Sequence, residues 1–144
     1  RRGTASQYVE IPEVKGGALA LSSMVVQAPE GGASMAVRQF APKSSLVWGA
    51  RILNAKRGAG DAPQLSYELI IYRDGRQVMK TPAQAWKVEK TDDAARLPIG
   101  GRLDFGGGMG PGDYVLELVV HDGLQKDAKH AVATQAIDFE VKAP

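Results

Sequence analysis

Apolar and polar residues alternate along most of this chain with a repeat of two residues. This repeat is typical of strands that bury one face, and the spacing of an amphipathic helix is nearly absent. The stretch 65–73 illustrates the pattern: one face collects Leu65, Tyr67, Leu69 and Ile71, and the other Ser66, Glu68, Ile70 and Tyr72. The chain is therefore expected to be built from strands.

By the same criterion, strands are predicted at 18–27, 35–40, 45–54, 65–73, 77–80, 85–90, 102–105, 113–122 and 132–142. Runs of this length, separated by Gly, Pro, Asn and Asp, predict an all-β fold, an immunoglobulin-like antiparallel β-sandwich of about seven to nine strands. A short helical turn is considered only at 91–96, where Asp92 and Asp93 favour a helix start and Pro98 limits its length.

Two turn motifs are expected to fix this fold. Asp74 and Gly75 separate two alternating runs and favour the two-residue turn of a hairpin. Pro111 and Gly112 turn the chain into the next strand, in which Tyr114 enters the core. The Tyr114 hydroxyl would then reach back to loop backbone, as in the tyrosine corner of immunoglobulin-like domains; a packed ring with a solvated hydroxyl is the alternative.

The glycine-rich run GGGMGPG at 106–112 does not predict a phosphate site. A dinucleotide fingerprint would need glycine at 111, where the chain has proline, followed by a helix. The residues after Gly112 instead alternate as a strand. No cofactor is expected.

Length, composition and charge narrow the function classes. The chain has 144 residues, 44% of them hydrophobic, which suits one soluble domain. Its net charge of +2 comes from scattered residues, so no nucleic-acid partner is expected. No apolar stretch reaches the roughly 18 residues that a membrane span requires. There is no cysteine, which excludes disulfides and thiolate chemistry.

Catalytic and metal-binding patterns are weak. His121 and His130, with Asp122 and Asp127 nearby, are the one candidate metal cluster. Neighbouring strand positions such as His121 and Asp122 point to opposite faces, so a solvated hairpin tip is favoured and no metal is expected. No nucleophile and base form a pair, and the sequence does not indicate an enzyme.

The aromatic residues suggest one alternative function. Trp48 shares a face with Leu46, Ala50 and Ile52, which favours a core tryptophan. Trp86 and Tyr72 are the candidates for an exposed site. Rings of this kind stack on sugars, so a carbohydrate-binding module is the alternative to a protein-interaction module.

Six segments carry a resemblance to a known family: 5–12 (ASQYVEIP), 17–22 (GALALS), 72–75 (YRDG), 111–114 (PGDY), 133–135 (ATQ) and 137–141 (IDFEV). With them the chain resembles the C-terminal region of large secreted acidobacterial proteins that carry a von Willebrand factor type A domain upstream. The resemblance covers nearly the whole chain and implies an extracytoplasmic, non-catalytic module. The metal-binding Asp-x-Ser-x-Ser motif of the type A domain does not occur here.

An internal similarity suggests how the chain is divided. Residues 5–11 parallel residues 133–139 position by position, although chance similarity between two short strands is the alternative. We expect 1–12 to be a strand left from a preceding sandwich, 13–17 a linker and 18–144 the domain. A strand without its own sheet must pair with this domain or with a neighbouring molecule. The expected partner strand contains Gln7, Tyr8, Val9 and Glu10.

Together these patterns predict a structural or protein-interaction module of a secreted multidomain protein, which binds through strand edges or end loops. The expected partner is a protein or a neighbouring domain, with self-association through the N-terminal strand.

Overall fold

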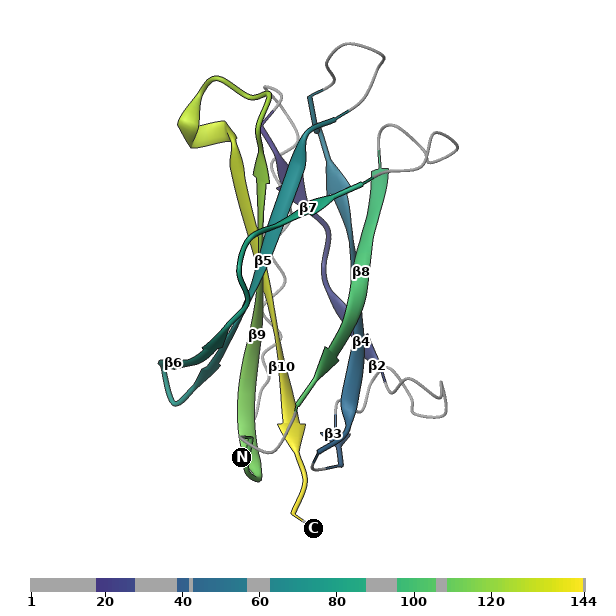
Figure 1. Cartoon of the computed structure of the whole chain (residues 1–144), viewed down its shortest axis with the longest axis vertical. Coiled ribbons are helices and arrows are strands. Elements are labelled where there is room, and N and C mark those ends of the chain that lie inside the picture. Colours follow the sequence, from purple (N-terminus) through teal and green to yellow (C-terminus); the bar gives the residue numbers. More distant parts are fainter. Residues whose placement is uncertain are drawn as a thin grey trace.

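The computed structural model describes residues 18–27, 39–41, 43–56, 63–87, 96–105 and 109–143. Apart from a short 3-10 helix, η3 (Ala128–His130), the regular elements of these residues are strands. The strands form two sheets that face each other across a common core (Figure 1). The predicted β-sandwich is confirmed. In this part of the chain no helix is long and apolar enough to cross a membrane.

The first sheet is built around β4 (Ser45–Leu53). On one side β4 pairs with β1 (Ala20–Leu21) and β2 (Val25–Gln27), and on the other with β8 (Arg96–Asp104). All three pairings are antiparallel. We call this sheet, including its outward surface, the β2-β4-β8 sheet.

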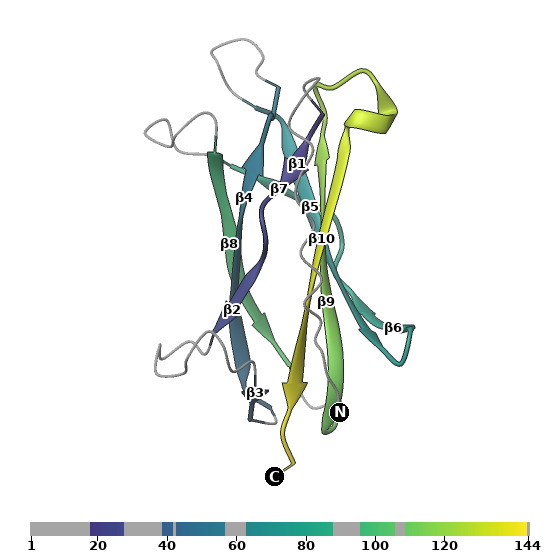
Figure 2. The ribbon, with the colours of Figure 1, turned by 180° about the vertical axis from the view of Figure 1, so that it is seen from behind.

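The second sheet has the order β3-β10-β9-β5-β6, and β7 also pairs with β5. The strands are β3 (Gln39–Phe40), β5 (Leu65–Arg73), β6 (Arg76–Lys80), β7 (Gln84–Trp86), β9 (Gly112–Asp122) and β10 (Val132–Val141). Only the β3–β10 pairing is parallel. Strands β5, β9 and β10 in one sheet, facing β2, β4 and β8 in the other, form an immunoglobulin-like arrangement, which Figure 2 shows from behind.

Inward side chains from both sheets form one hydrophobic core. Trp48 is only 2% exposed, and its strand neighbour across the sheet is Gly101. A Cβ atom at Gly101 would lie 3.3 Å from Nε1 of Trp48, so the absence of a side chain at this position makes room for the indole. Trp48 is therefore a core residue.

The predicted strand 18–27 is interrupted. Leu21 pairs with Ile52 and Val25 with Gly49, so three residues face two on β4 and form a bulge. Ser22 supports it, because its Oγ accepts a hydrogen bond from the Arg51 backbone N–H (2.8 Å).

Strand β8 begins at Arg96, six residues before the predicted start at Arg102, and the proposed helical turn is wrong at Arg96. Pro98 lies inside this strand. Proline is accepted there because β8 is an edge strand, paired among the described residues only with β4.

Several predictions lie outside the described residues. These are the N-terminal strand 1–12 with Gln7, Tyr8, Val9 and Glu10, the linker 13–17, most of strand 35–40, residues 88–90, residues 91–95 of the helical turn, and glycines 106–108.

Candidate interaction surfaces

Tyr114 and the turn before β9 form a closed polar unit. Tyr114 is 3% exposed, and its hydroxyl donates to the carbonyl of Gly110, four residues earlier, at 2.7 Å. Pro111 and Gly112 make the turn between them, and Gly112 has a φ of 149°. This geometry is that of a tyrosine corner.

Arg73 completes this unit and was not singled out in the sequence. Its Nη1 donates to the Tyr114 hydroxyl (3.2 Å) and its Nη2 to the carbonyl of Pro111 (2.8 Å). Asp74 and Gly75 follow Arg73 with φ values of 54° and 77°, as a two-residue hairpin turn requires. The alternation pattern shows Arg73 only as the last residue before that turn, so no local signal identifies its partners.

Trp86 links the two sheets. It pairs with Leu65 and shares that residue's inward face, where its ring meets Tyr67 edge-on at 5.8 Å. Its Nε1 donates to the carbonyl of Pro98 on β8, at 2.9 Å. The indole N–H is thus used within the protein.

Tyr72 lies on the outer face of the second sheet. Its hydroxyl donates to Oε1 of Glu117 at 2.9 Å. This hydrogen bond raises the pKa of Tyr72, and burial and the negative charge of Glu117 act in the same direction. Trp86 pairs with Leu65, at the other end of β5. Tyr72 lies seven positions from Leu65 along this strand, which is roughly 23 Å. The two candidate sugar-binding rings therefore do not form one platform.

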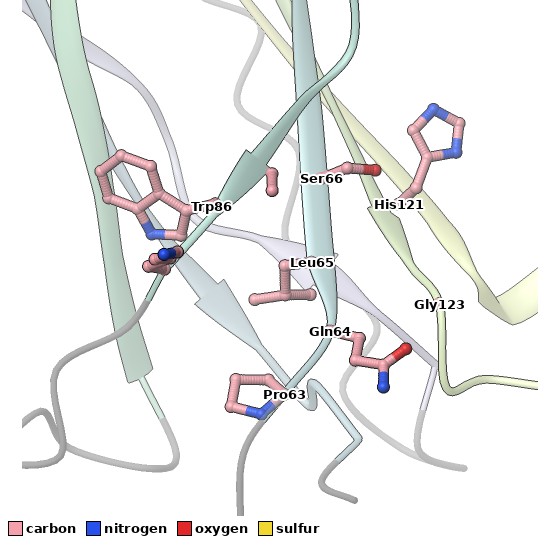
Figure 3. Close-up of a pocket in the computed structure, with 9 residues that line it drawn as sticks. Pro63, Gln64, Leu65, Ser66, Trp86, His121 and Gly123 are labelled. Atoms are coloured by element: carbon pink, nitrogen blue, oxygen red, sulfur yellow. The ribbon is translucent and has the colours of Figure 1, made fainter.

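An open hollow of about 560 Å³ lies where β5 begins, beside the ends of β7 and β9. Its lining includes Gln64, Leu65, Ser66, Trp86, Lys87 and His121. In Figure 3 the indole of Trp86 and the imidazole of His121 point to opposite sides of the strands. These two side chains therefore do not face each other across the hollow.

The two histidines have different carboxylate neighbours. His121 Nε2 lies 3.5 Å from Oε1 of Glu68, and His130 Nδ1 lies 3.3 Å from Oδ2 of Asp127. Asp122 is buried instead, where it accepts the backbone N–H groups of Lys56 and Leu124. Within the described ranges no three His, Asp or Glu side chains are grouped to hold a metal ion.

The outer edge of β10 has no charged residue from Val132 to Ala136, and Asp138 and Glu140 follow. Just before this edge begins, the Leu19 N–H donates to the carbonyl of His130 (3.0 Å), so the segment leading into β1 lies beside its start. Only β3 pairs with it there, at Glu140 and Val141. The Lys142 N–H donates to the carbonyl of Phe40 on β3, which shows that even-numbered residues direct their backbone groups toward this edge. The register with β9 is unbroken from Val132 to Val141, so the backbone groups of Val132, Thr134 and Ala136 also point there.

The edges of β8 and β6 carry residues that oppose strand addition. On β8, Pro98 has no N–H and its carbonyl is bound by Trp86, while Arg102 and Asp104 add exposed charges. On β6, Arg76 and Lys80 are exposed. The β10 edge has no proline or charge at Val132, Thr134 or Ala136.

No protein-family model matches this chain, and no curated protein matches it in sequence. Two solved structures show a distant similarity. The CARDB domain of a Pyrococcus furiosus protein, solved with di-metal ions, is 12% identical, with a TM-score of 0.44 over 89% of this chain and 97% of that one. A superoxide reductase (neelaredoxin) from Ignicoccus hospitalis is 13% identical, with a TM-score of 0.45 over 86% and 82%. At these values neither similarity indicates what this chain does.

Proposed function

We propose that this chain is a non-catalytic structural and protein-interaction module that accepts an extended strand along the outer edge of β10. The observation that supports the proposal is the contrast between its edges. Proline and charges occupy the edges of β8 and β6, whereas Val132, Thr134 and Ala136 present backbone groups without either feature. Added strands bind such an edge through main-chain hydrogen bonds.

The proposed occupant is the segment Gln7–Glu10 of this chain. Tyr8 and Val9 in this segment favour strands. The longer stretch 5–11 is similar in sequence to residues 133–139 of β10. A copy of a terminal strand is suited to extend the same sheet. The secreted setting of the module rests on the family resemblance alone.

Binding of a peptide tests this proposal. A labelled peptide of residues 1–12 is added to a chain that lacks these residues, and binding is followed by fluorescence anisotropy. We expect saturable binding that Ala136→Pro abolishes, because this change removes an outward N–H without touching the ladder to β9. This N–H donates to Oε1 of Gln135 (3.3 Å) in the structure, so an added strand would have to displace that side chain.

Ala136→Ser is the matched control, since it keeps the N–H at the same position, and it should bind as the parent chain does. Thermal unfolding checks that both variants fold. Absence of peptide binding, or equal binding by Ala136→Pro, would overturn the proposal. The mass of the full chain in solution then decides whether the segment folds back or crosses to a neighbour.

A further inference from the structure

The outward surface of the β2-β4-β8 sheet is basic. Paired residues share a face, and Leu46, Trp48 and Ile52 point into the core, so the residues between them point outward. The charged residues at these outward positions of β4 and β8 are Arg51, Arg96, Arg102 and Asp104. All four are exposed, and three of them are cations.

The outward surface of β5, β9 and β10 has the opposite charge. We call it the β5-β9-β10 face. Its outward positions hold the carboxylates Glu68, Asp113, Glu117, Asp138 and Glu140, while neighbouring β6 contributes Lys80. Lys80 lies 3.7 Å from Glu68 and offsets part of this charge. The whole chain has a net charge of +2, so negative charge is concentrated on this face although the chain as a whole is slightly basic.

Both faces also expose apolar side chains. Val25 is 45% exposed on the β2-β4-β8 sheet, and Val115 and Val132 are 38% and 41% exposed on the β5-β9-β10 face. Gly49 pairs with Gly100 on the basic side, which leaves a strip of sheet without side chains next to Val25. An apolar side chain from an opposing surface can approach the backbone closely there.

From this complementarity we propose that the outer face of the β2-β4-β8 sheet of one copy docks on the β5-β9-β10 face of a second copy. The two surfaces differ, so the contact is head-to-tail. In a dimer, one copy still has an unoccupied basic sheet and the other an unoccupied acidic face. Longer rows of copies therefore form as concentration rises. This contact uses sheet faces and is independent of strand addition at the β10 edge.

The size and charge of the contact set its expected strength. Strands β5, β9 and β10 have nine to eleven residues each and cover roughly 14 by 30 Å, or about 400 Å². The opposing sheet has only two strands of nine residues, β4 and β8, so the contact is at most about this size. A stable complex buries about 800 Å² on each partner, so the association is expected to be weak. Opposite charges contribute to it, so the association should weaken as salt increases.

Sedimentation velocity on the full chain, over concentrations up to about 1 mM, tests the proposal. We expect the average mass to rise with concentration at low salt and to fall when salt is added. Arg51→Glu with Arg102→Glu makes both faces acidic, and Asp113→Lys with Glu117→Lys cancels the net negative charge of the β5-β9-β10 face. Each double variant should associate at least about tenfold more weakly than the parent.

In a mixture of the two double variants, the unchanged acidic face of the first can meet the unchanged basic sheet of the second. The mixture should therefore associate more strongly than either variant alone. Arg76→Glu with Lys126→Glu is the matched control for Arg51→Glu with Arg102→Glu, because it makes the same change in net charge at exposed positions in the β5–β6 hairpin and the β9–β10 turn. It should behave as the parent chain does. A parent chain that stays monomeric, a control that dissociates like the face variants, or a mixture that stays monomeric would each overturn the proposal.

Discussion

Arg73 and Tyr114 form one hydrogen-bonded unit although 41 positions separate them in the sequence. The guanidinium carbon lies 5.3 Å from the centre of the Tyr114 ring, and Nη1 donates to the hydroxyl. That hydroxyl donates in turn to Gly110. The end of β5 and the turn before β9 are therefore held together at one end of the sandwich.

Tyr114→Phe should lower the free energy of unfolding by about 1–2 kcal/mol. The change removes the hydroxyl and leaves the carbonyl of Gly110 and one donor of Arg73 without this partner. Urea unfolding measures the loss. Tyr72→Phe is the control, because Tyr72 and Glu117 lie on the outer face where water can replace the bond, and it should change stability by less than about 0.5 kcal/mol. Equal losses in the two variants would contradict this account.

Gly112→Ala should destabilise the same unit by more than about 1 kcal/mol. At a φ of 149° an alanine is strained, and its Cβ would lie 2.7 Å from Nη2 of Arg73. Gly110→Ala provides the comparison within one turn, since its Cβ would lie 3.8 Å from Nη1, an ordinary contact. Thermal unfolding should show a lower midpoint for Gly112→Ala alone. Parallel behaviour of the two variants would argue against a steric role for Arg73.

The glycine pair of the β2-β4-β8 sheet should respond asymmetrically to alanine. At Gly100 a Cβ would lie 2.7 Å from the backbone oxygen of Trp48, whereas at Gly49 the nearest atom is 3.7 Å away. We therefore expect Gly100→Ala to destabilise by about 1–3 kcal/mol and Gly49→Ala to be close to neutral. Chemical denaturation of both variants checks this, and a larger loss at Gly49 would refute it.

Trp86→Phe should remove about 1 kcal/mol of stability. Phenylalanine keeps an aromatic ring beside Tyr67 but cannot donate to the carbonyl of Pro98. Hydrogen exchange provides a local readout, with faster exchange expected along β7 and β8. If exchange and stability both stay at the parent values, the link between the sheets is energetically unimportant.

The ionisation of Tyr72 should depend on Glu117. The hydrogen bond to the Glu117 carboxylate, then burial, then the charge of Glu117 raise the pKa of Tyr72 above about 10. The folded state holds this proton more tightly than the unfolded state. The contribution of the hydrogen bond to the free energy of unfolding is therefore complete below about pH 10 and is lost as pH rises through the raised pKa. Glu117→Gln should lower the pKa, measured by tyrosinate absorbance with Tyr72→Phe as reference. An unchanged titration in Glu117→Gln would be inconsistent with this coupling.

The alternation of residues predicted the fold class because burying one face of a strand leaves a direct record in the sequence. Leu65 to Ile71 and Tyr114 to Val120 show it, and both strands have the predicted inward face. The sequence of Asp74 and Gly75 similarly predicts the local backbone that the turn adopts. These features depend on near neighbours in the chain.

Features that depend on distant residues could not be predicted in this way. The partners of Arg73 and the bond between Trp86 and Pro98 require the strands to be placed first. The start of β8 was missed because Pro98 usually indicates a break, and only its edge position makes it acceptable. The opposite charges of the two faces likewise emerge only from the strand register.

The bond between Trp86 and Pro98 also bears on how copies of this domain coexist when crowded. It occupies the carbonyl of Pro98, and proline has no N–H. A strand added at that point of β8 would therefore find no free backbone partner there. Where copies of this domain crowd together, sheet-to-sheet pairing is therefore closed at this point of β8, and any strand addition must use another edge.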